Sequence, residues 1–471
     1  MSKKLIYTIV FLLILLISGI LRFKGLVEQS YWMDELGSMA LCDPQMKLSK
    51  VISLTMHDTH PLVYNVMLWL WLKFAGYTEV GGRSMSALLG TIGLVPIYYL
   101  GKELFNKKIG VYATLISGLN AFLIQFSQET RSYALLFLLT SISYLFFFRV
   151  IKNERNIHIL VIYIASSIVM CYTHYYGIIV MLTQLINLII YLYKDVRNRR
   201  SLISTSIISA LIIAVSISPL FKYIILAANL PSSSWVPAPS VWDFAFYGHA
   251  YTKTVFLDII FLFLIFYGIY SIFYDKINNN YLFNITSLVV WISFGLLLPF
   301  FWSVLVKPIL ILRATIIVLP GIIVLISLGL YYIKSRMLKT IILTLIIIFS
   351  LRSYNKYNSI PQKEQWREVL NVISESSESV PVYDIVYSYR FDKSFYAIYA
   401  EMLNLDIKVL PFDVLKEQYF TNKLPKYFWV VEAHSNKINS SKILTDNKIR
   451  KVNEVKYLNA GAAKFLSVER R

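Results

Sequence analysis

Charged residues are scarce in this chain, and cysteine is almost absent. Only 15% of the 471 residues are charged and 57% are hydrophobic, against about 25% and about 45–50% in soluble globular domains. This composition argues against a soluble enzyme. The two cysteines, Cys42 and Cys171, lie far apart and outside any CxxC or Cys/His cluster, so they indicate neither a disulfide framework nor a structural zinc site.

The charge that is present is mostly positive. Lys and Arg outnumber Asp and Glu by 46 to 27, which gives a net charge of +19. The basic residues stand in short clusters between apolar runs, and they form no continuous stripe with aromatic residues between them. Such a stripe is typical of nucleic-acid binding, whereas short basic loops between apolar runs are typical of membrane proteins. We therefore expect a lipid bilayer as a partner and no nucleic acid.

Long apolar runs predict a polytopic α-helical membrane protein. A helix needs about 20 apolar residues to cross about 30 Å of hydrocarbon. Eleven runs approach this length, at residues 5–21, 85–101, 109–126, 132–150, 157–173, 175–193, 202–222, 254–274, 282–302, 308–333 and 337–351. The first run follows Lys3 and Lys4 and has no small-residue cleavage site behind it, so we interpret it as an uncleaved span with a cytoplasmic N-terminus.

The stretch at residues 62–77 is ambiguous. It is apolar and contains Trp69 and Trp71, but Lys73 and Gly76 interrupt it. If it lies flat on the bilayer, all short loops on one side are basic, as the positive-inside rule requires. If it spans, this pattern is inverted. We therefore predict an interfacial helix within the first outer loop.

An odd number of spans places everything after residue 351 on the outer face. We predict a transmembrane catalytic module at residues 1–351, whose first outer loop, 22–84, carries the active site. Residues 352–471 are expected to form a small extracytoplasmic α/β domain, because helix-like and strand-like segments alternate there. The helix-like segments are residues 362–374 and 393–403, and the strand-like segments are 380–387, 406–410 and 427–431. This tail contains no Walker loop and no GxGxxG motif.

Ionisable residues gather beside the apolar runs of the predicted outer face. Asp34 and Glu35 follow the first span closely. Carboxylates in apolar surroundings tend to have raised pKa values and can act as general bases. The dipeptide alone fits a solvated pair of loop acids better than a catalytic pair.

Two histidines and a carboxylate occur together at residues 57–60. Asp58 stands where a helix N-cap or turn residue would stand, and Pro61 can open a helix, so a purely structural interpretation remains open. His57 and His60 are three residues apart and have no third metal ligand nearby.

The loop between two later spans contains Glu129 and Arg131. An arginine guanidinium can hold a phosphate through two hydrogen bonds, although Arg131 can also reach the interface or pair with Glu129. His174 follows another span, and Arg313 lies near the outer end of a later one. Single residues of this kind are more often structural than catalytic, but all of them lie on one predicted face.

The order of these motifs resembles the bacterial branch of glycosyltransferase family 39, the PMT_2-type, dolichyl-phosphate-mannose protein mannosyltransferase-like enzymes of the GT-C superfamily. The matching motifs are WMDE at 32–35, DTHPLVY at 58–64, RSMSA at 83–87, QETRSYA at 128–134, THYYG at 173–177 and QWR at 365–367. The chain differs from the common family pattern at Leu62, where a second proline is frequent, and at Ala314, where an aromatic residue often follows the arginine. The second difference weakens the transfer of a role to Arg313.

This resemblance implies a GT-C fold and an enzyme that transfers one sugar from a polyprenyl-phosphate donor. The acceptor would be a hydroxyl of a protein, lipid or cell-envelope glycan at the outer face of the cell membrane. A single positioned carboxylate is enough for one displacement with inversion. No cofactor is required by the resemblance, and a divalent metal is left open.

The roles implied for single residues follow from the same resemblance. Asp34 would be the catalytic base with Glu35 beside it, and Arg131 and Arg313 would bind the carrier phosphate. The other implied active-site residues are Asp58, His60, Glu129 and His174.

Three other classes of protein share parts of this pattern. A lipid-linked glycan flippase or transporter also has many spans, but its charged residues should lie near the middle of the bilayer. A polymerase or ligase of surface polysaccharide acts at the same face on diphosphate-linked glycans. A non-enzymatic scaffold gives no reason for Asp34, His60 and Arg131 to share one side.

Overall fold

The computed structural model describes residues 3–152, 156–194, 199–229, 236–274, 279–377, 385–388, 392–433, 442–446 and 448–467. The chain forms two compact units, and each is described by itself. The membrane unit comprises Met1–Lys24, Gln45–Leu70 and Arg83–Lys356, and the tail unit comprises Gly25–Pro44, Trp71–Gly82 and Tyr357–Arg471. Residues of the first loop therefore fold with the tail, although they lie more than 300 residues earlier in the sequence. The division predicted after residue 351 stays a prediction.

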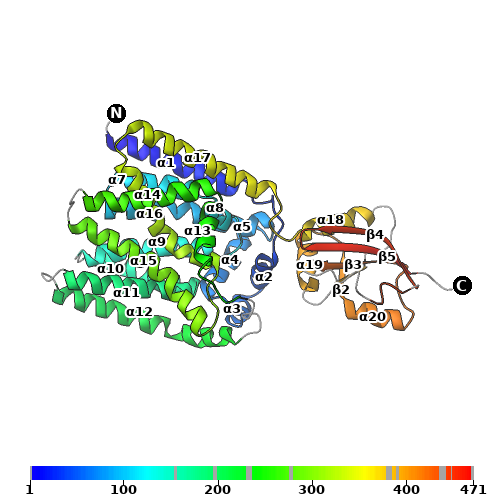
Figure 1. Cartoon of the computed structure of the whole chain (residues 1–471). Coiled ribbons are helices and arrows are strands. Elements are labelled where there is room, and N and C mark those ends of the chain that lie inside the picture. Colours follow the sequence, from blue (N-terminus) through cyan, green and yellow to red (C-terminus); the bar gives the residue numbers. More distant parts are fainter. Residues whose placement is uncertain are drawn as a thin grey trace. The chain divides into compact units, whose positions relative to one another are not determined.

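The membrane unit is built from helices (Figure 1). Its elements are α1 (Lys3–Phe23), α3 (Leu48–Met56), α4 (Leu62–Ala75), α5 (Glu79–Ile92), α6 (Leu94–Leu104), α7 (Lys107–Leu119), α8 (Ala121–Ser127), α9 (Tyr133–Ile151), α10 (Ile157–Thr173), α11 (Tyr176–Lys194), α12 (Arg199–Ala228), α13 (Asp243–Thr252), α14 (Val255–Tyr274), α15 (Asn279–Leu305), the 3₁₀ helix η2 (Leu312–Val318), α16 (Leu319–Tyr332) and α17 (Arg336–Ser359). The first residues of α5 and the last of α4 belong to the tail unit.

Among the described residues, nine helices are long and apolar enough to cross a membrane, or ten if α7 and α8 form one bent span. The multi-pass membrane protein is therefore confirmed, whereas the number of eleven spans is not. Ten of the eleven predicted runs coincide with these helices. The remaining one, α10, is a shorter apolar helix of 17 residues, at the lower limit of what crosses a bilayer.

The bend between α7 and α8 has a local cause. The two helices meet at an angle of 62°, and Asn120 between them has an extended backbone. Its side-chain oxygen accepts a hydrogen bond from the backbone N–H of Leu123 at 2.9 Å, and its amide donates to the carbonyl of Tyr251 at 2.9 Å. An asparagine in this N-cap position ends one helix and starts another.

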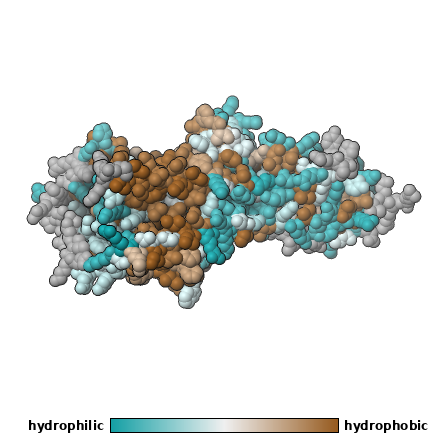
Figure 2. Space-filling model, turned by 90° about the horizontal axis from the view of Figure 1, so that it is seen from above, coloured by the Kyte–Doolittle hydropathy of each residue, from teal (hydrophilic) through white to brown (hydrophobic). Residues whose placement is uncertain are grey.

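Burial differs strongly between the helices of the membrane unit. The window spanned by η2 and α16 is 89% buried and that of α9 is 83% buried, whereas α1 is 17% buried and α12 is 22% buried. The buried pair forms the centre and the others the periphery. Figure 2 shows that the surface of this unit carries a broad hydrophobic zone, as expected for helices that face lipid.

The centre is closely packed where α16 meets α14. A Cβ atom at Gly329 would lie 1.8 Å from the carbonyl oxygen of Leu264. Only glycine allows the two helix backbones to approach this closely, which is a common device between membrane helices.

The tail unit contains a five-stranded mixed sheet. Its strands are β1 (Ile385–Ser388), β2 (Lys408–Pro411), β3 (Tyr427–Ala433), β4 (Ile449–Tyr457) and β5 (Ala460–Ser467), in the order β2-β1-β3-β5-β4. The pairs β1–β2 and β1–β3 are parallel, and β3–β5 and β4–β5 are antiparallel. Its helices are α2 (Met33–Leu41), α18 (Trp366–Ser377), α19 (Asp392–Met402) and α20 (Phe412–Phe420). The predicted C-terminal α/β domain is thus confirmed as a small mixed-sheet domain.

A hydrophobic core lies between this sheet and α20. Its best-buried side chains, all at most 1% exposed, are Tyr387, Leu415, Phe428, Val430, Ala463 and Phe465. The strand-like segments 406–410 and 427–431 correspond to β2 and β3, and the predicted helices correspond to α18 and α19. Of the strand predicted at 380–387, residues 380–384 lie outside the described residues, and the rest belongs to β1.

Candidate active site

The residues predicted from the motifs fall into two groups. Asp34 and Glu35 belong to the tail unit, and Asp58, His60, Glu129, Arg131, His174 and Arg313 belong to the membrane unit. The name histidine cluster is used below for Asp58, His60, Arg131, His174, Arg313 and Tyr133. The name α2 anchor is used for Glu35, Lys363 and Glu364.

The centre of the histidine cluster is His60, in the loop between α3 and α4. Its Nδ1 lies 3.1 Å from Asp58 Oδ2 and 2.9 Å from Thr59 Oγ1, and its Nε2 lies 2.6 Å from Arg131 Nη2. A guanidinium can only donate hydrogen bonds, so Nε2 must accept. The proton of the neutral ring is then on Nδ1, which donates to Asp58.

Asp58 is ionised within this cluster. Burial alone would raise the pKa of its carboxyl group. The hydrogen bond from His60, the backbone N–H of Thr59 and the charge of Arg131 outweigh burial and lower the pKa below its ordinary value. The same negative charge acts on Tyr175, whose pKa is raised to about 12 by burial and by Asp58.

Arg131 is held in a short buried loop between α8 and α9. The residue is 7% exposed. Its carbonyl accepts a hydrogen bond from Ser86 Oγ at 3.4 Å, and Ser86 Oγ also lies 3.0 Å from the hydroxyl of Tyr64. In the same loop, the side-chain amide of Gln128 donates to the carbonyl of Lys24 at 2.7 Å. These bonds fix the loop backbone, and the arginine side chain is directed to His60 instead of to solvent.

His174 lies beside this arrangement at the end of α10. Its ring centroid is 6.4 Å from that of His60 and 5.8 Å from that of Tyr133. Its Nδ1 accepts the backbone N–H of Tyr176 at 3.2 Å. Burial lowers the pKa of His174 well below its ordinary value, and the positive charges of Arg131 and Arg313 lower it further. His174 is therefore neutral.

Arg313 also belongs to the cluster, although Ala314 follows it in place of the usual aromatic residue. It lies in η2, and its guanidinium carbon is 5.8 Å from the ring centroid of Tyr133, a cation–π contact. Glu129 faces another cation. The pKa of Lys253 is lowered by burial, and the negative charge of Glu129 partly opposes that effect.

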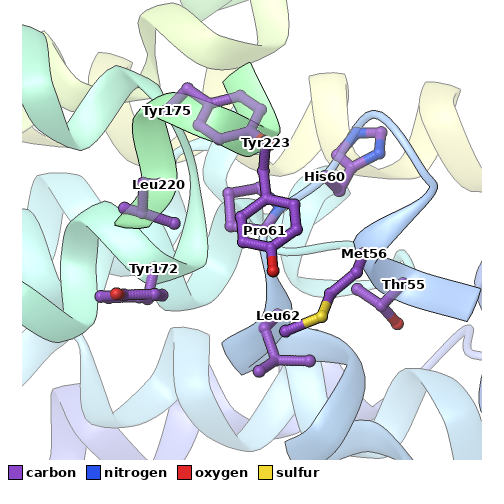
Figure 3. Close-up of a pocket in the computed structure, with 9 residues that line it drawn as sticks. All are labelled: Thr55, Met56, His60, Pro61, Leu62, Tyr172, Tyr175, Leu220 and Tyr223. Atoms are coloured by element: carbon purple, nitrogen blue, oxygen red, sulfur yellow. The ribbon is translucent and has the colours of Figure 1, made fainter. Parts of the chain in front are cut away.

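An aromatic pocket opens next to His60 (Figure 3). Its walls come from α3, the loop that carries His60, the end of α10 and the second half of α12. It is lined by Thr55, Met56, His60, Pro61, Leu62, Tyr172, Tyr175, Leu220 and Tyr223. Leu220 and Tyr223 lie at the end of the apolar run 202–222 and belong to none of the motifs, so the sequence did not indicate them.

In the tail unit, Asp34 and Glu35 occupy the first turn of α2. Glu35 is fully buried, and its Oε2 pairs with Lys363 Nζ at 2.8 Å. The backbone N–H of Met33 donates to Glu364 Oε2 at 3.3 Å. Negative groups at a helix N-terminus are stabilised by the helix dipole. Asp34 is half-buried, and Lys363 Nζ donates to the side chain of Glu35.

The segment before α2 is hydrogen-bonded to helices α18 and α19 of the tail unit. Ser30 Oγ donates to Glu368 Oε2 at 2.6 Å, and the backbone N–H of Tyr31 donates to the hydroxyl of Tyr399 at 2.9 Å. Arg367 pairs with Glu79 at 2.5 Å and with Glu368 at 3.0 Å. Burial lowers the pKa of Arg367, but the negative groups around it raise the pKa overall. The QWR motif is thus part of a structural connection.

Metal ligands are not gathered in the part of the chain that the structure describes. No group of three or more His, Cys, Asp or Glu side chains there could hold an ion. His57 donates from Nδ1 to the carbonyl of Ser53 at 2.7 Å, within its own helix. The metal dependence left open by the sequence stays untested.

The family model described as dolichyl-phosphate-mannose-protein mannosyltransferase matches residues 59–223. This segment contains His60, Glu129, Arg131 and His174. The protein is a membrane glycosyltransferase, and over this third of the chain it resembles the family. The predicted enzyme class is thereby confirmed, and no curated protein sequence matches the glycosyltransferase.

Solved structures show the fold of the glycosyltransferase. It is similar to ArnT from Cupriavidus metallidurans in the apo state, with a TM-score of 0.64 and 11% identity over 98% of both chains. The same protein bound to undecaprenyl phosphate matches with a TM-score of 0.61 and 10% identity, over 96% of this chain and 97% of the other. The archaeal oligosaccharyltransferase AglB from Archaeoglobus fulgidus matches with a TM-score of 0.57 and 11% identity, over 91% of this chain and 69% of the other. At these identities the likeness concerns the fold alone, which is GT-C-like.

Proposed function

We propose that this glycosyltransferase transfers a single sugar from a polyprenyl-phosphate donor to a hydroxyl of a protein, lipid or cell-envelope glycan, with inversion. The histidine cluster carries the proposal. It places the buried guanidinium of Arg131 within hydrogen-bond distance of a neutral His60, beside a pocket lined by aromatic and aliphatic side chains. A cation next to an apolar surface suits a ligand that joins a phosphate to a hydrocarbon chain. The similarly folded ArnT binds undecaprenyl phosphate.

The proposed reaction is one displacement at the anomeric carbon. Asp34 takes the proton of the acceptor hydroxyl, and the hydroxyl oxygen forms the new bond to C1 of the sugar. The bond between C1 and the phosphate oxygen breaks, and its electron pair leaves with the polyprenyl phosphate. Arg131, with Arg313 in the same cluster, stabilises the charge that develops on the leaving phosphate.

The other predicted site residues have supporting roles in this proposal. Asp58 accepts the hydrogen bond of His60, and the neutral ring of His174 lies next to it. The negative charge of Glu129 favours the charged form of Lys253. Glu35 supports Asp34 from the same helical turn through its ion pair with Lys363. No step of the proposed reaction requires a metal.

We also propose that the N-terminus lies in the cytoplasm and that the chemistry occurs at the outer face of the cell membrane. The basic loops support this orientation through the positive-inside rule. Protease protection of tags placed before Lys3 and after residue 467 tests it. In intact cells, a protease added outside should cleave only the C-terminal tag. Protection of both tags would place both ends in the cytoplasm and would contradict the proposal.

The decisive experiment compares the wild-type protein with Asp34→Asn. Membrane extract is supplied with synthetic polyprenyl-phosphate donors that carry radiolabelled sugars, and transfer and donor binding are measured at matched expression. We expect a loss of transfer of about 10²- to 10⁴-fold, with donor binding retained, because a general base contributes on that scale. Asp413→Asn, an exposed carboxylate of the tail unit, is the matched control and should retain full activity.

Each other outcome has a definite meaning. Full activity of Asp34→Asn would remove Asp34 from the role of base. Absence of transfer by the wild-type protein with every donor, together with movement of the labelled donor across vesicle membranes, would favour a flippase instead.

A further inference from the structure

We infer that His60 is a positioning residue for Arg131, acting as a neutral spacer between the guanidinium and the carboxylate of Asp58. The inference rests on the proposed function, in which Arg131 binds the donor phosphate. The resemblance gave His60 no individual role. The geometry assigns one, because both ring nitrogens are engaged by groups of opposite charge.

The two hydrogen bonds of the His60 ring have fixed directions. Arg131 Nη2 approaches His60 Nε2 at 2.6 Å and must be the donor. Asp58 Oδ2 lies 3.1 Å from Nδ1, and an ionised carboxylate must be the acceptor. Only the neutral tautomer with its proton on Nδ1 satisfies both bonds. The lowered pKa of Asp58 is consistent with this direction.

The neutral ring of His60 also matters for the charge next to Arg131. A carboxylate bound directly to Arg131 would neutralise it and would compete with a phosphate for the same donors. The imidazole of His60 accepts one guanidinium hydrogen without adding negative charge there. Asp58 is held at the far side of the ring, so it orients the imidazole but does not pair directly with the arginine through that edge.

His60 also restricts the orientation of the Arg131 guanidinium. A guanidinium has five donors in one rigid plane, so one short hydrogen bond at Nη2 limits the rotation of the whole group. His60 itself is held by Asp58 and Thr59 on one side and borders the aromatic pocket on the other (Figure 3). The hydrogen bond to His60 therefore helps to fix the plane of the Arg131 guanidinium.

Two variants distinguish the contributions of the two ring nitrogens of His60. In His60→Gln, the amide oxygen can replace Nε2 as acceptor for Arg131. In His60→Asn, the shorter amide can replace the Nδ1 donor to Asp58 but does not reach Arg131. We expect the affinity for undecaprenyl phosphate to fall about tenfold in His60→Asn and by less than about threefold in His60→Gln, since a hydrogen bond to a charged group is lost only in the first. His57→Gln, three residues away on the exposed side of α3, should bind like the wild type.

A double-variant cycle tests whether His60 acts through Arg131. We expect Arg131→Ala to weaken binding of undecaprenyl phosphate, and His60→Asn to have no further effect in the Arg131→Ala background. Multiplied effects would show that His60 acts independently and would overturn the inference. If His60 had a purely structural role, His60→Asn and His60→Gln would lower the melting temperature and the turnover by similar amounts. The glutamine variant would then not restore donor affinity.

The cycle distinguishes the failure of the inference from that of the proposed function. Unchanged affinity in Arg131→Ala would refute the phosphate-binding role itself. Weakened affinity in Arg131→Ala with unchanged affinity in His60→Asn would refute only the role of His60. If His60→Asn does not fold, Asp58→Ala tests the same series of hydrogen bonds, because it removes the acceptor that keeps the proton on Nδ1 of His60. Unchanged affinity in that variant would overturn the inference.

Discussion

The histidine cluster and the α2 anchor solve the problem of buried charge in different ways. In the α2 anchor, the carboxylate of Glu35 meets the ammonium of Lys363 directly, and the two side chains are 0% and 6% exposed. In the histidine cluster, a neutral imidazole separates Asp58 from Arg131, and the side chains of His60 and Asp58 are 26% and 33% exposed. The buried carboxylate of Glu35 is thus compensated directly by Lys363, whereas the imidazole of His60 adds no negative charge beside Arg131. Glu35 therefore fits a supporting role better than a catalytic one.

The largest effect is expected from breaking the α2 anchor with Lys363→Met. Removing one partner of a buried ion pair leaves an uncompensated charge and costs about 3–5 kcal/mol. We expect a large fall in the thermal stability of the purified protein. The double variant Glu35→Gln/Lys363→Met should recover most of it, because no unpaired charge remains. A single variant as stable as the wild type would show that the pair is not structural.

A smaller effect, dependent on pH, is expected from the histidine cluster. The folded protein holds the pKa of His174 well below its ordinary value, whereas the unfolded chain has a pKa of about 6.5. The unfolded state therefore binds the proton first, and stability is lost as the pH falls below about 6.5 towards the folded pKa, by about 1.4 kcal/mol per pH unit.

His174→Asn removes this titration and keeps an acceptor for the N–H of Tyr176. Melting temperatures of the wild type and the variant should therefore converge between pH 7 and pH 5. Parallel curves over this range would show that His174 is not held neutral in the folded state.

The smallest effect on stability is expected when the same lysine-to-methionine substitution is made in an exposed ion pair. Lys416 pairs with Asp413 at 2.7 Å, but the two side chains are 47% and 85% exposed. Lys416→Met should change stability by less than about 1 kcal/mol, because exposed pairs contribute little. A cost equal to that of Lys363→Met would mean that burial does not distinguish the two lysines.

The helical part of the fold was predictable because lipid-facing helices require long apolar runs. All eleven runs became helices, but their lengths were not fully predictable. The break at Asn120 depends on a tertiary bond to the carbonyl of Tyr251 as well as on its local cap. In the tail unit, α20 and the hairpin of β4 and β5 were missed. Strand β4 has the sequence IRKVNEVKY and lies at the sheet edge, where backbone pairing to β5 suffices and apolar alternation is not required.

The candidate residues were predictable as types and positions, but their partners were not. Polar residues at the ends of apolar runs indicated His60 and Arg131, and the structure brings these two together across 71 residues of sequence. Nothing in the sequence indicated Lys363, because a lysine in a polar tail has no local signature. Its role follows only from the burial of Glu35, which is separated from it by 328 residues.

That separation has a consequence for biosynthesis. Helix α2 is among the first elements to leave the ribosome, yet the lysine that neutralises Glu35 is translated 328 residues later. At about 5–20 residues per second, the helix waits on the order of tens of seconds for its partner. A nascent or truncated chain that ends before Lys363 carries the carboxylates of the first turn without this support. The glycosyltransferase thus completes the setting of Asp34 only after nearly all of its membrane helices have been made.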